Sequence, residues 1–230
     1  METVNSRSYI LVTGGAGGIG SAVCKLLPNI GITPIVGFNT NSTQAHTLAK
    51  ELNGFAVKID MNIKNSIEEA IQIIINQLKE ADKLAGVVLG ASPPPDILSF
   101  LDINSDHLLN QFQVNVIGSQ ILLKGLIKNF YRKKKMGTVI GILTQAIGTN
   151  SQLPATGMGA YIIAKGALKT MLSVCAAEYP WLKVRTINPS FTKTKMLDVF
   201  DPRYLDILDY QKKISTPQKI AQLIIKEITN

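Results

Sequence analysis

The chain has 230 residues, of which 46% are hydrophobic and 17% charged, and its formal net charge is +8. This composition predicts one packed domain spanning residues 1–230 and excludes a disordered chain. We expect no membrane association, because no apolar stretch reaches the ~18–20 residues that a span needs and the start lacks a secretory signal pattern. Two cysteines and two histidines offer few metal ligands, so we expect a cytoplasmic protein with reduced thiols and no metal.

Short apolar runs rich in β-branched residues alternate with segments of helical periodicity. The expected strands are residues 9–13, 33–38, 56–59, 85–89, 138–143 and 184–188. The expected helices are residues 18–27, 43–52, 66–79, 107–130, 157–178 and 217–228. This alternation predicts an α/β fold with three layers, in which a doubly wound parallel sheet carries helices on both faces. Ligands bind at the carboxyl edge of such a sheet.

A glycine-rich turn, Thr13-Gly-Gly-Ala-Gly-Gly-Ile-Gly20, follows the first expected strand. Without side chains the backbone can approach a phosphate, and the start of the next helix offers free N–H groups and partial positive charge. An ordinary tight turn is the alternative, but the position after a first strand favours a dinucleotide site. The candidate contacts are Gly14, Gly15, Gly18, Ile19 and Gly20.

Tyr161 and Lys165 lie one helical turn apart on one face of an expected helix. A free tyrosine has a pKa near ~10, and a neighbouring ammonium group favours the phenolate and so lowers that pKa. Tyr161 can then exchange a proton with the oxygen of a carbonyl or alcohol group whose carbon gains or loses hydride. A surface pair without a role is the alternative interpretation.

The motifs Thr13-Gly-x3-Gly18-Ile-Gly20 and Tyr161-x3-Lys165 together resemble those of the short-chain dehydrogenase/reductase family. The resemblance runs from about residue 8 to about residue 225 and implies a Rossmann-like sheet of strand order 3-2-1-4-5-6. It also implies an oxidoreductase that uses NAD(P)(H) to reduce a ketone or a 3-oxoacyl-type carbonyl. It also implies that Lys165 holds the nicotinamide ribose and that Asn115 supports a water-linked proton path. The positions that match further cofactor contacts of the family are Asp60, Met61, Gly90, Ala91 and Thr194.

The chain departs from the family pattern at two places. Thr144 stands near the end of the fifth expected strand, where the family has a serine, so it is our candidate for binding the substrate oxygen; Thr149 and Ser151 are the alternatives. Gly90 and Ala91 lie where the family commonly has Asn-Asn-Ala-Gly, so two amides that brace the central strand are missing. The segment 196–213 is expected to cover the substrate pocket.

The second expected strand ends in Phe38-Asn39-Thr40-Asn41-Ser42, which lacks the carboxylate that binds the adenosine ribose of NAD and repels a 2′-phosphate. We therefore predict NADP(H), with Asn39 as a contact, although the absence of Arg and Lys there leaves NAD(H) possible. The positive charge favours a small or carrier-tethered anionic carbonyl substrate. The basic run 132–135 is best interpreted as a solvated loop; a docking patch for an anionic carrier or cofactor is the alternative, and nucleic acid is the least favoured partner. The resemblance implies a homodimer or homotetramer that packs helices 107–130 and 157–178 against their copies.

Two other functions stay open at this point. One is a regulatory or structural module that binds the cofactor without redox turnover, which the altered positions 90, 91 and 144 favour. The other is a sugar-nucleotide epimerase or dehydratase, which has a similar Tyr–Lys pair but usually a longer C-terminal substrate region.

Overall fold

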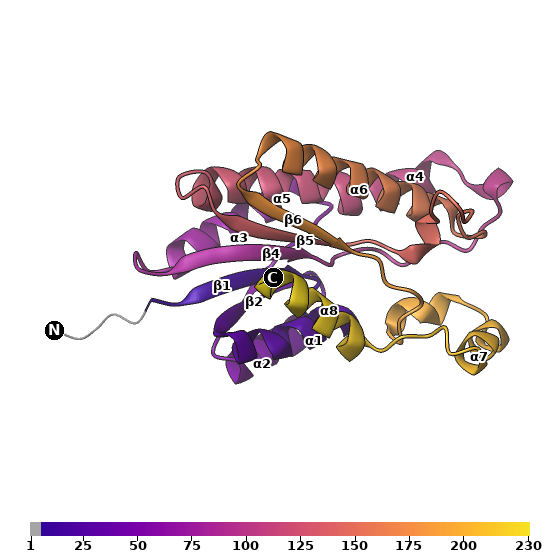
Figure 1. Cartoon of the computed structure of the whole chain (residues 1–230), viewed down its shortest axis with the longest axis horizontal. Coiled ribbons are helices and arrows are strands. Elements are labelled where there is room, and N and C mark those ends of the chain that lie inside the picture. The colour runs from indigo at the N-terminus through magenta and orange to yellow at the C-terminus, as the bar shows by residue number, and fades with distance from the viewer. Residues whose placement is uncertain (1–5) are drawn as a thin grey trace.

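A computed structural model describes residues 6–230, in which six parallel strands form one sheet in the order β3-β2-β1-β4-β5-β6 (Figure 1). The strands are β1 (Ser8–Thr13), β2 (Ile32–Phe38), β3 (Phe55–Lys58), β4 (Lys83–Leu89), β5 (Gly137–Ile142) and β6 (Leu182–Ile187). The predicted fold class and strand order are confirmed.

The helices agree with the sequence prediction except in two regions. They are α1 (Gly18–Leu26), α2 (Ser42–Glu51), α3 (Lys64–Gln77), α4 (Ser105–Phe112), α5 (Ser119–Leu126), α6 (Gly159–Glu178), α7 (Pro202–Tyr210) and α8 (Pro217–Thr229). The expected continuous helix 107–130 is interrupted, because π-helical segments Gln113–Gly118 and Ile127–Tyr131 follow α4 and α5. The second difference is α7, which the periodicity of the sequence did not predict.

The sheet is buried on both faces, so its strands read as nearly continuous apolar runs. In β1, Leu11 packs on the face covered by α3, α5 and α6, whereas Ile10 and Val12 pack on the face covered by α1, α2 and α8. Figure 1 shows these two helical layers on opposite sides of the sheet, with α7 set apart beyond one end of the strands. Side chains that alternate between two buried faces fix the register of the central strand.

By length and composition α6 is able to span a membrane, with a mean hydropathy of 1.3, so the expectation that no stretch is long and apolar enough was wrong. A core helix of a soluble protein has the same properties. Leu168 and Leu172 of α6 are buried against the sheet, and Lys165 is buried beside them on the same helix. This packing is that of a core helix.

The order of the strands creates a switch point between β1 and β4. The chain leaves β1 toward β2 and β3 and then returns to β4 on the other side of β1, so the loops after β1 and β4 diverge. A cavity of about 620 Å³ lies at this carboxyl edge and includes Ile19 from the first loop and Gly90 from the second among its lining residues. The ligand site of the predicted fold is therefore present.

Candidate active site

The glycine-rich turn is shaped by close backbone contacts. Gly14 has a φ of 66°, a left-handed conformation that favours glycine, and its backbone lies against Gly90 and Ala91. A Cβ on Gly20 would overlap the carbonyl oxygen of Gly14, and a Cβ on Gly18 would overlap the Thr194 side chain. Each glycine thus removes a specific clash, and the turn brings Thr194 beside the start of α1.

The same turn leads into the first N–H groups of α1. The N-cap residue Gly17 has no side chain with which to cap the helix, so the start of α1 is open to an acceptor from outside. A helix start of this kind binds phosphate groups. Ile19 and Thr194 also line the cavity, and the backbone here therefore fits the pyrophosphate of a dinucleotide.

Thr13 supplies the bracing that the missing amides were expected to weaken. Its Oγ1 accepts hydrogen bonds from the backbone N–H groups of Gly90 (3.0 Å) and Ala91 (3.1 Å) and donates to the carbonyl of Val88 (3.3 Å). One buried hydroxyl thereby ties the end of β1 to the end of β4. Sequence reasoning missed this role, although a threonine at the last position of a buried strand is a signal for it.

Tyr161 and Lys165 both line the cavity from α6, and both are buried, with exposed fractions of 8% and 2%. The ammonium group of Lys165 donates to the backbone carbonyl of Ile142 at the end of β5 (2.9 Å). Its Nζ lies 5.6 Å from the centre of the Tyr161 ring. The interpretation as a surface pair is excluded.

The pKa values of this pair differ from the sequence expectation. Burial raises the pKa of Tyr161 to about 12, and the interaction with the Thr144 side chain only partly opposes this rise. Burial also lowers the pKa of Lys165 to about 7. The expected lowering of the Tyr161 pKa was wrong for this state of the protein, because loss of hydration outweighs the hydrogen bond with Thr144. At neutral pH, Tyr161 is a protonated phenol, the form that can donate a proton.

Thr144 follows β5, lines the cavity and interacts with Tyr161. Its Oγ1 also accepts a hydrogen bond from the backbone N–H of Ala146 (3.1 Å), which fixes the hydroxyl at the start of a short 3₁₀ turn. The alternatives, Thr149 and Ser151, contact each other (3.3 Å), are exposed and lie outside the lining of the cavity. Of the three candidates, the structure brings only Thr144 to Tyr161.

Asn115 is buried in the first π-helical segment and does not line the cavity. Its Nδ2 donates to the carbonyl (2.9 Å) and the Oε1 (3.1 Å) of Gln111, whose Nε2 donates to the carbonyl of Pro94 (2.8 Å). Among residues 6–230, Asn115 Oδ1 has no hydrogen-bond partner. Gln111 connects this amide to the proline-rich loop after β4, a contact that no sequence motif indicated.

The other predicted cofactor contacts lie outside the cavity that Tyr161 lines. Asn39 is exposed just after β2, and Met61 is buried after β3. The carboxylate of Asp60 accepts the backbone N–H of Asn62 (2.9 Å) and so closes the turn after β3. These positions follow the carboxyl ends of neighbouring strands, where the fold places the adenosine half of a dinucleotide.

The segment after β6 lines the cavity, as predicted, and the unpredicted helix α7 contributes Tyr204 and Leu208 to this lining. Phe191, Phe200 and Tyr204 form a cluster of aromatic rings with centroids 5.3–6.2 Å apart, and all three line the cavity. Tyr210 is 89% exposed and is not part of the lining. The aromatic cluster gives the cavity an apolar wall.

Comparison with known proteins agrees with this site. Residues 8–204 match the short chain dehydrogenase family. The chain is 22% identical over 205 residues to diacetyl reductase [(S)-acetoin forming] of Staphylococcus epidermidis, covering 86% of this chain and 77% of that protein. It is 24% identical over 234 residues to the NADP-dependent 3-hydroxy acid dehydrogenase of Schizosaccharomyces pombe, covering 96% and 86%.

A solved structure has the same fold. The 3-ketoacyl-(acyl-carrier-protein) reductase from Brucella melitensis, complexed with NADH, superposes with a TM-score of 0.82 at 18% identity, covering 96% of this chain and 90% of the other. The family match extends over most of the chain and includes both the glycine turn and the Tyr161–Lys165 pair. This chain belongs to the short-chain dehydrogenase/reductase family of NAD(P)-dependent oxidoreductases.

Proposed function

We propose that this protein reduces a ketone or a 3-oxoacyl-type carbonyl to an alcohol, with Tyr161 as the proton donor. The observation that carries the proposal is the burial of Tyr161 and Lys165 in the wall of the cavity to which the glycine turn contributes. When bound, the nicotinamide cofactor supplies the hydride. The residues of this chain position the carbonyl, exclude water and supply the proton.

Three polar side chains of the cavity have distinct tasks in this proposal. Tyr161, with a pKa of about 12, holds its proton at neutral pH and releases it to the alkoxide that forms on the substrate. The Thr144 hydroxyl binds the same substrate oxygen and orients it toward Tyr161. Lys165, anchored on the carbonyl of Ile142, favours the phenolate that remains after proton transfer and contacts the cofactor ribose. Asn115 takes part indirectly, through a water-linked path for the returning proton.

NADP(H) is the proposed cofactor, on the basis of two features near the end of β2. The residues after β2 include no carboxylate that would repel a 2′-phosphate, and Asn39 there is exposed. Lys58 pairs in register with Phe38 and therefore places a cation one strand away. Titration of the cofactors should show NADPH binding at least tenfold more tightly than NADH, and Asn39→Asp should reduce or reverse that ratio, since the new carboxylate repels the 2′-phosphate. Equal affinities in the wild-type protein would contradict this choice.

Turnover is tested by following nicotinamide absorbance with a panel of carbonyl compounds. The panel should include diacetyl, 3-oxo acids and 3-oxoacyl thioesters, because the relatives are named for compounds of these kinds. We expect oxidation of NADPH with at least one of them. Tight cofactor binding without oxidation on any member would instead support the second candidate, a cofactor-binding module, which the replacement of the family serine by Thr144 favours.

We also propose a cytoplasmic homodimer or homotetramer. Leu109, Ile117, Ile163 and Val174 are apolar side chains of α4, α6 and the π segment between α4 and α5 that are 43–62% exposed in the single chain. Burying them against a second copy removes this apolar surface from water. Light scattering at micromolar concentration should give twice or four times the mass of one chain, and a monomer would contradict the proposal.

A further inference from the structure

Two lysines lie at the mouth of the cavity and take no part in the chemistry described above. Among the described residues that line the cavity, the charged ones are Lys165, Lys212 and Lys213, and none is an aspartate or a glutamate. Lys165 is buried and bound to Ile142, whereas Lys212 and Lys213 are exposed at the rim. Within residues 6–230, neither rim lysine forms an ion pair. The cavity therefore presents an electropositive mouth.

Lys212 occupies a backbone position at which a residue other than glycine is unusual. Lys212 follows the C-cap of α7 with a φ of 54°, and the N–H groups of Lys212 and Lys213 donate to the carbonyls of Asp209 (2.8 Å) and Leu208 (2.9 Å). These two bonds define a Schellman motif, in which glycine is favoured at the left-handed position. A lysine there is strained relative to glycine, yet it places an ammonium group on the rim of the cavity.

We propose that Lys212 and Lys213 form an anion subsite and that the substrate carries a carboxylate or a phosphate at the end remote from the reacting carbonyl. This inference rests on the proposed reductase function. Phe200 packs against the cluster that includes Tyr161 and stacks on Tyr204, and Leu208 is hydrogen-bonded to Lys213 at the rim. All three side chains line the cavity, so we expect the middle of the substrate to be apolar. The matching compound is an oxo acid or oxo phosphate whose apolar chain joins the carbonyl to the anionic group.

The bound cofactor is a second anion that Lys212 and Lys213 are able to contact. Near the rim, the backbone N–H of Lys193 donates to the backbone carbonyl of Ser215 (2.9 Å). The next residue, Thr194, lies against the glycine turn, where the pyrophosphate is expected. The two sources of negative charge are separable by kinetics. A substrate subsite affects kcat/KM for an anionic substrate relative to a neutral one, whereas a cofactor contact affects the KM for NADPH.

The test compares oxo acids of increasing chain length with their methyl esters, at saturating NADPH. The wild-type enzyme should prefer one acid over its ester, and Lys212→Gln/Lys213→Gln should lower that ratio about tenfold, with the preference also weakening as salt is added. Lys219→Gln, which removes an equal charge from α8 outside the cavity lining, should leave the ratio unchanged. An unchanged ratio in the double variant, or an effect confined to the KM for NADPH, would overturn the proposal.

A second pair of variants separates binding from folding. Lys212→Gly should raise Tm by about 2–4 °C, because it relieves the left-handed strain, and should nevertheless lower the acid-to-ester ratio. Lys135→Gly relieves the same kind of strain (φ 44°) at the opposite end of the sheet and should raise Tm without changing the ratio. A ratio that is equally affected by both variants would show that general charge, not the rim, sets the preference.

If no compound of the panel is reduced, binding still decides the question. Saturated carboxylic acids and their amides, which cannot be reduced, are titrated into the NADPH-loaded protein. Tighter binding of the acid, lost in Lys212→Gln/Lys213→Gln, would support the anion subsite even though the proposed turnover had failed. Equal binding of acid and amide would reject the subsite.

Discussion

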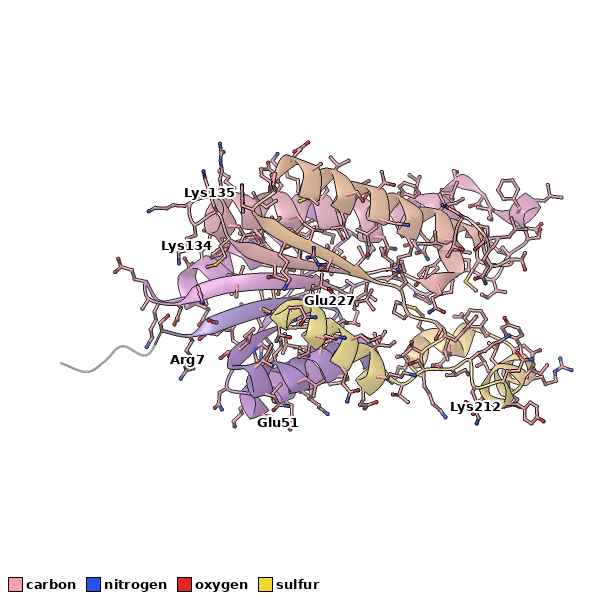
Figure 2. The ribbon with its side chains drawn as sticks, viewed as in Figure 1. Arg7, Glu51, Lys134, Lys135, Lys212 and Glu227 are labelled. Carbon is pink, nitrogen blue, oxygen red and sulfur yellow. The ribbon has the colours of Figure 1, made fainter. Side chains whose placement is uncertain are left out.

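Lysines stand at both ends of the sheet, but in opposite environments. At the amino edge, residues 132–135 precede β5 and are exposed, and the nearby cavity of about 380 Å³ is rimmed by other exposed lysines. At the carboxyl edge, Lys165 is 2% exposed and bound to a backbone carbonyl. Figure 2 shows Lys134 and Lys135 at the end of the molecule away from Lys212.

The difference shows that net charge is a poor guide to the site. The four-residue basic run is the densest charge in the sequence, yet none of its residues belongs to the lining of the cavity that Tyr161 lines. The buried Lys165 has lost its hydration, which lowers its pKa to about 7. A place in the lining of the cavity, and not charge density along the sequence, marks the functional edge.

The largest expected effect is on the chemistry of the carboxyl edge. Tyr161→Phe removes the proton donor and should reduce kcat by about 10²–10⁴-fold, while the affinity for NADPH stays within about twofold. Tyr210→Phe removes an exposed hydroxyl outside the cavity and should leave kcat unchanged. Steady-state rates and cofactor titration of both variants make the measurement. A Tyr161→Phe enzyme with the wild-type kcat would show that the phenol of Tyr161 is not the proton donor.

The next effect concerns the free energy of unfolding and its dependence on pH through the buried Lys165. The pKa of Lys165 is about 7 in the folded chain and near its ordinary value of 10.5 in the unfolded chain, so the unfolded chain binds the extra proton between these values. The free energy of unfolding should therefore rise with pH in this window, by roughly 3 kcal/mol from pH 7 to pH 10, relative to Lys165→Met.

Lys134→Met provides the contrast from the amino edge, since Lys134 is exposed. The difference in free energy of unfolding between the wild-type protein and Lys134→Met should show no such rise with pH. Denaturant unfolding at several pH values measures both differences. A flat difference for Lys165→Met would mean that the ammonium group is hydrated in solution.

A smaller effect is expected at the glycine turn. In Gly20→Ala the new Cβ meets the carbonyl oxygen of Gly14, so we expect a loss of about 1–3 kcal/mol in stability together with weaker cofactor binding. Gly166→Ala introduces a Cβ in α6 with no atom within 4 Å and should be neutral or stabilising by up to about 1 kcal/mol. Urea unfolding of the two variants gives the comparison. Equal losses at the two positions would show that the tight contact at Gly20 is absent in solution.

The smallest effect is expected from the basic run itself. Lys133→Gln/Lys134→Gln should change stability by less than about 0.5 kcal/mol, because both side chains are exposed. The kcat/KM for a small ketone should also stay the same, since the run lies at the other edge. A tenfold loss would mean that the amino edge takes part in substrate capture.

The sequence predicted the parts of the molecule that depend on local pattern. The apolar runs predicted the strands, and the glycines between Thr13 and Gly20 predicted the turn, because each has a characteristic spacing. The Tyr161-x3-Lys165 spacing likewise predicted two side chains on one helical face. These features are set by residues close to each other in the chain.

The features that the sequence did not predict depend on contacts between distant segments. The Thr13 hydroxyl reaches the loop after β4, and Gln111 reaches Pro94. The hydrophobic pattern of residues 107–130 predicts one long helix. The π-helical segments within it were not predicted, because an i→i+5 hydrogen bond changes the hydrophobic period only slightly. The pKa of Tyr161 rises because tertiary packing removes water, which spacing along a helix does not report.

The most direct test of the account follows the hydride itself. The protein is incubated with NADPH that carries deuterium at the reactive C4 position and with the best carbonyl compound of the panel, and the product is analysed by mass spectrometry. The account predicts one deuterium on the carbinol carbon of the alcohol, formed by the wild-type protein and greatly reduced in Tyr161→Phe. Bound NADPH that stays intact with every compound, or an alcohol without deuterium, would contradict it.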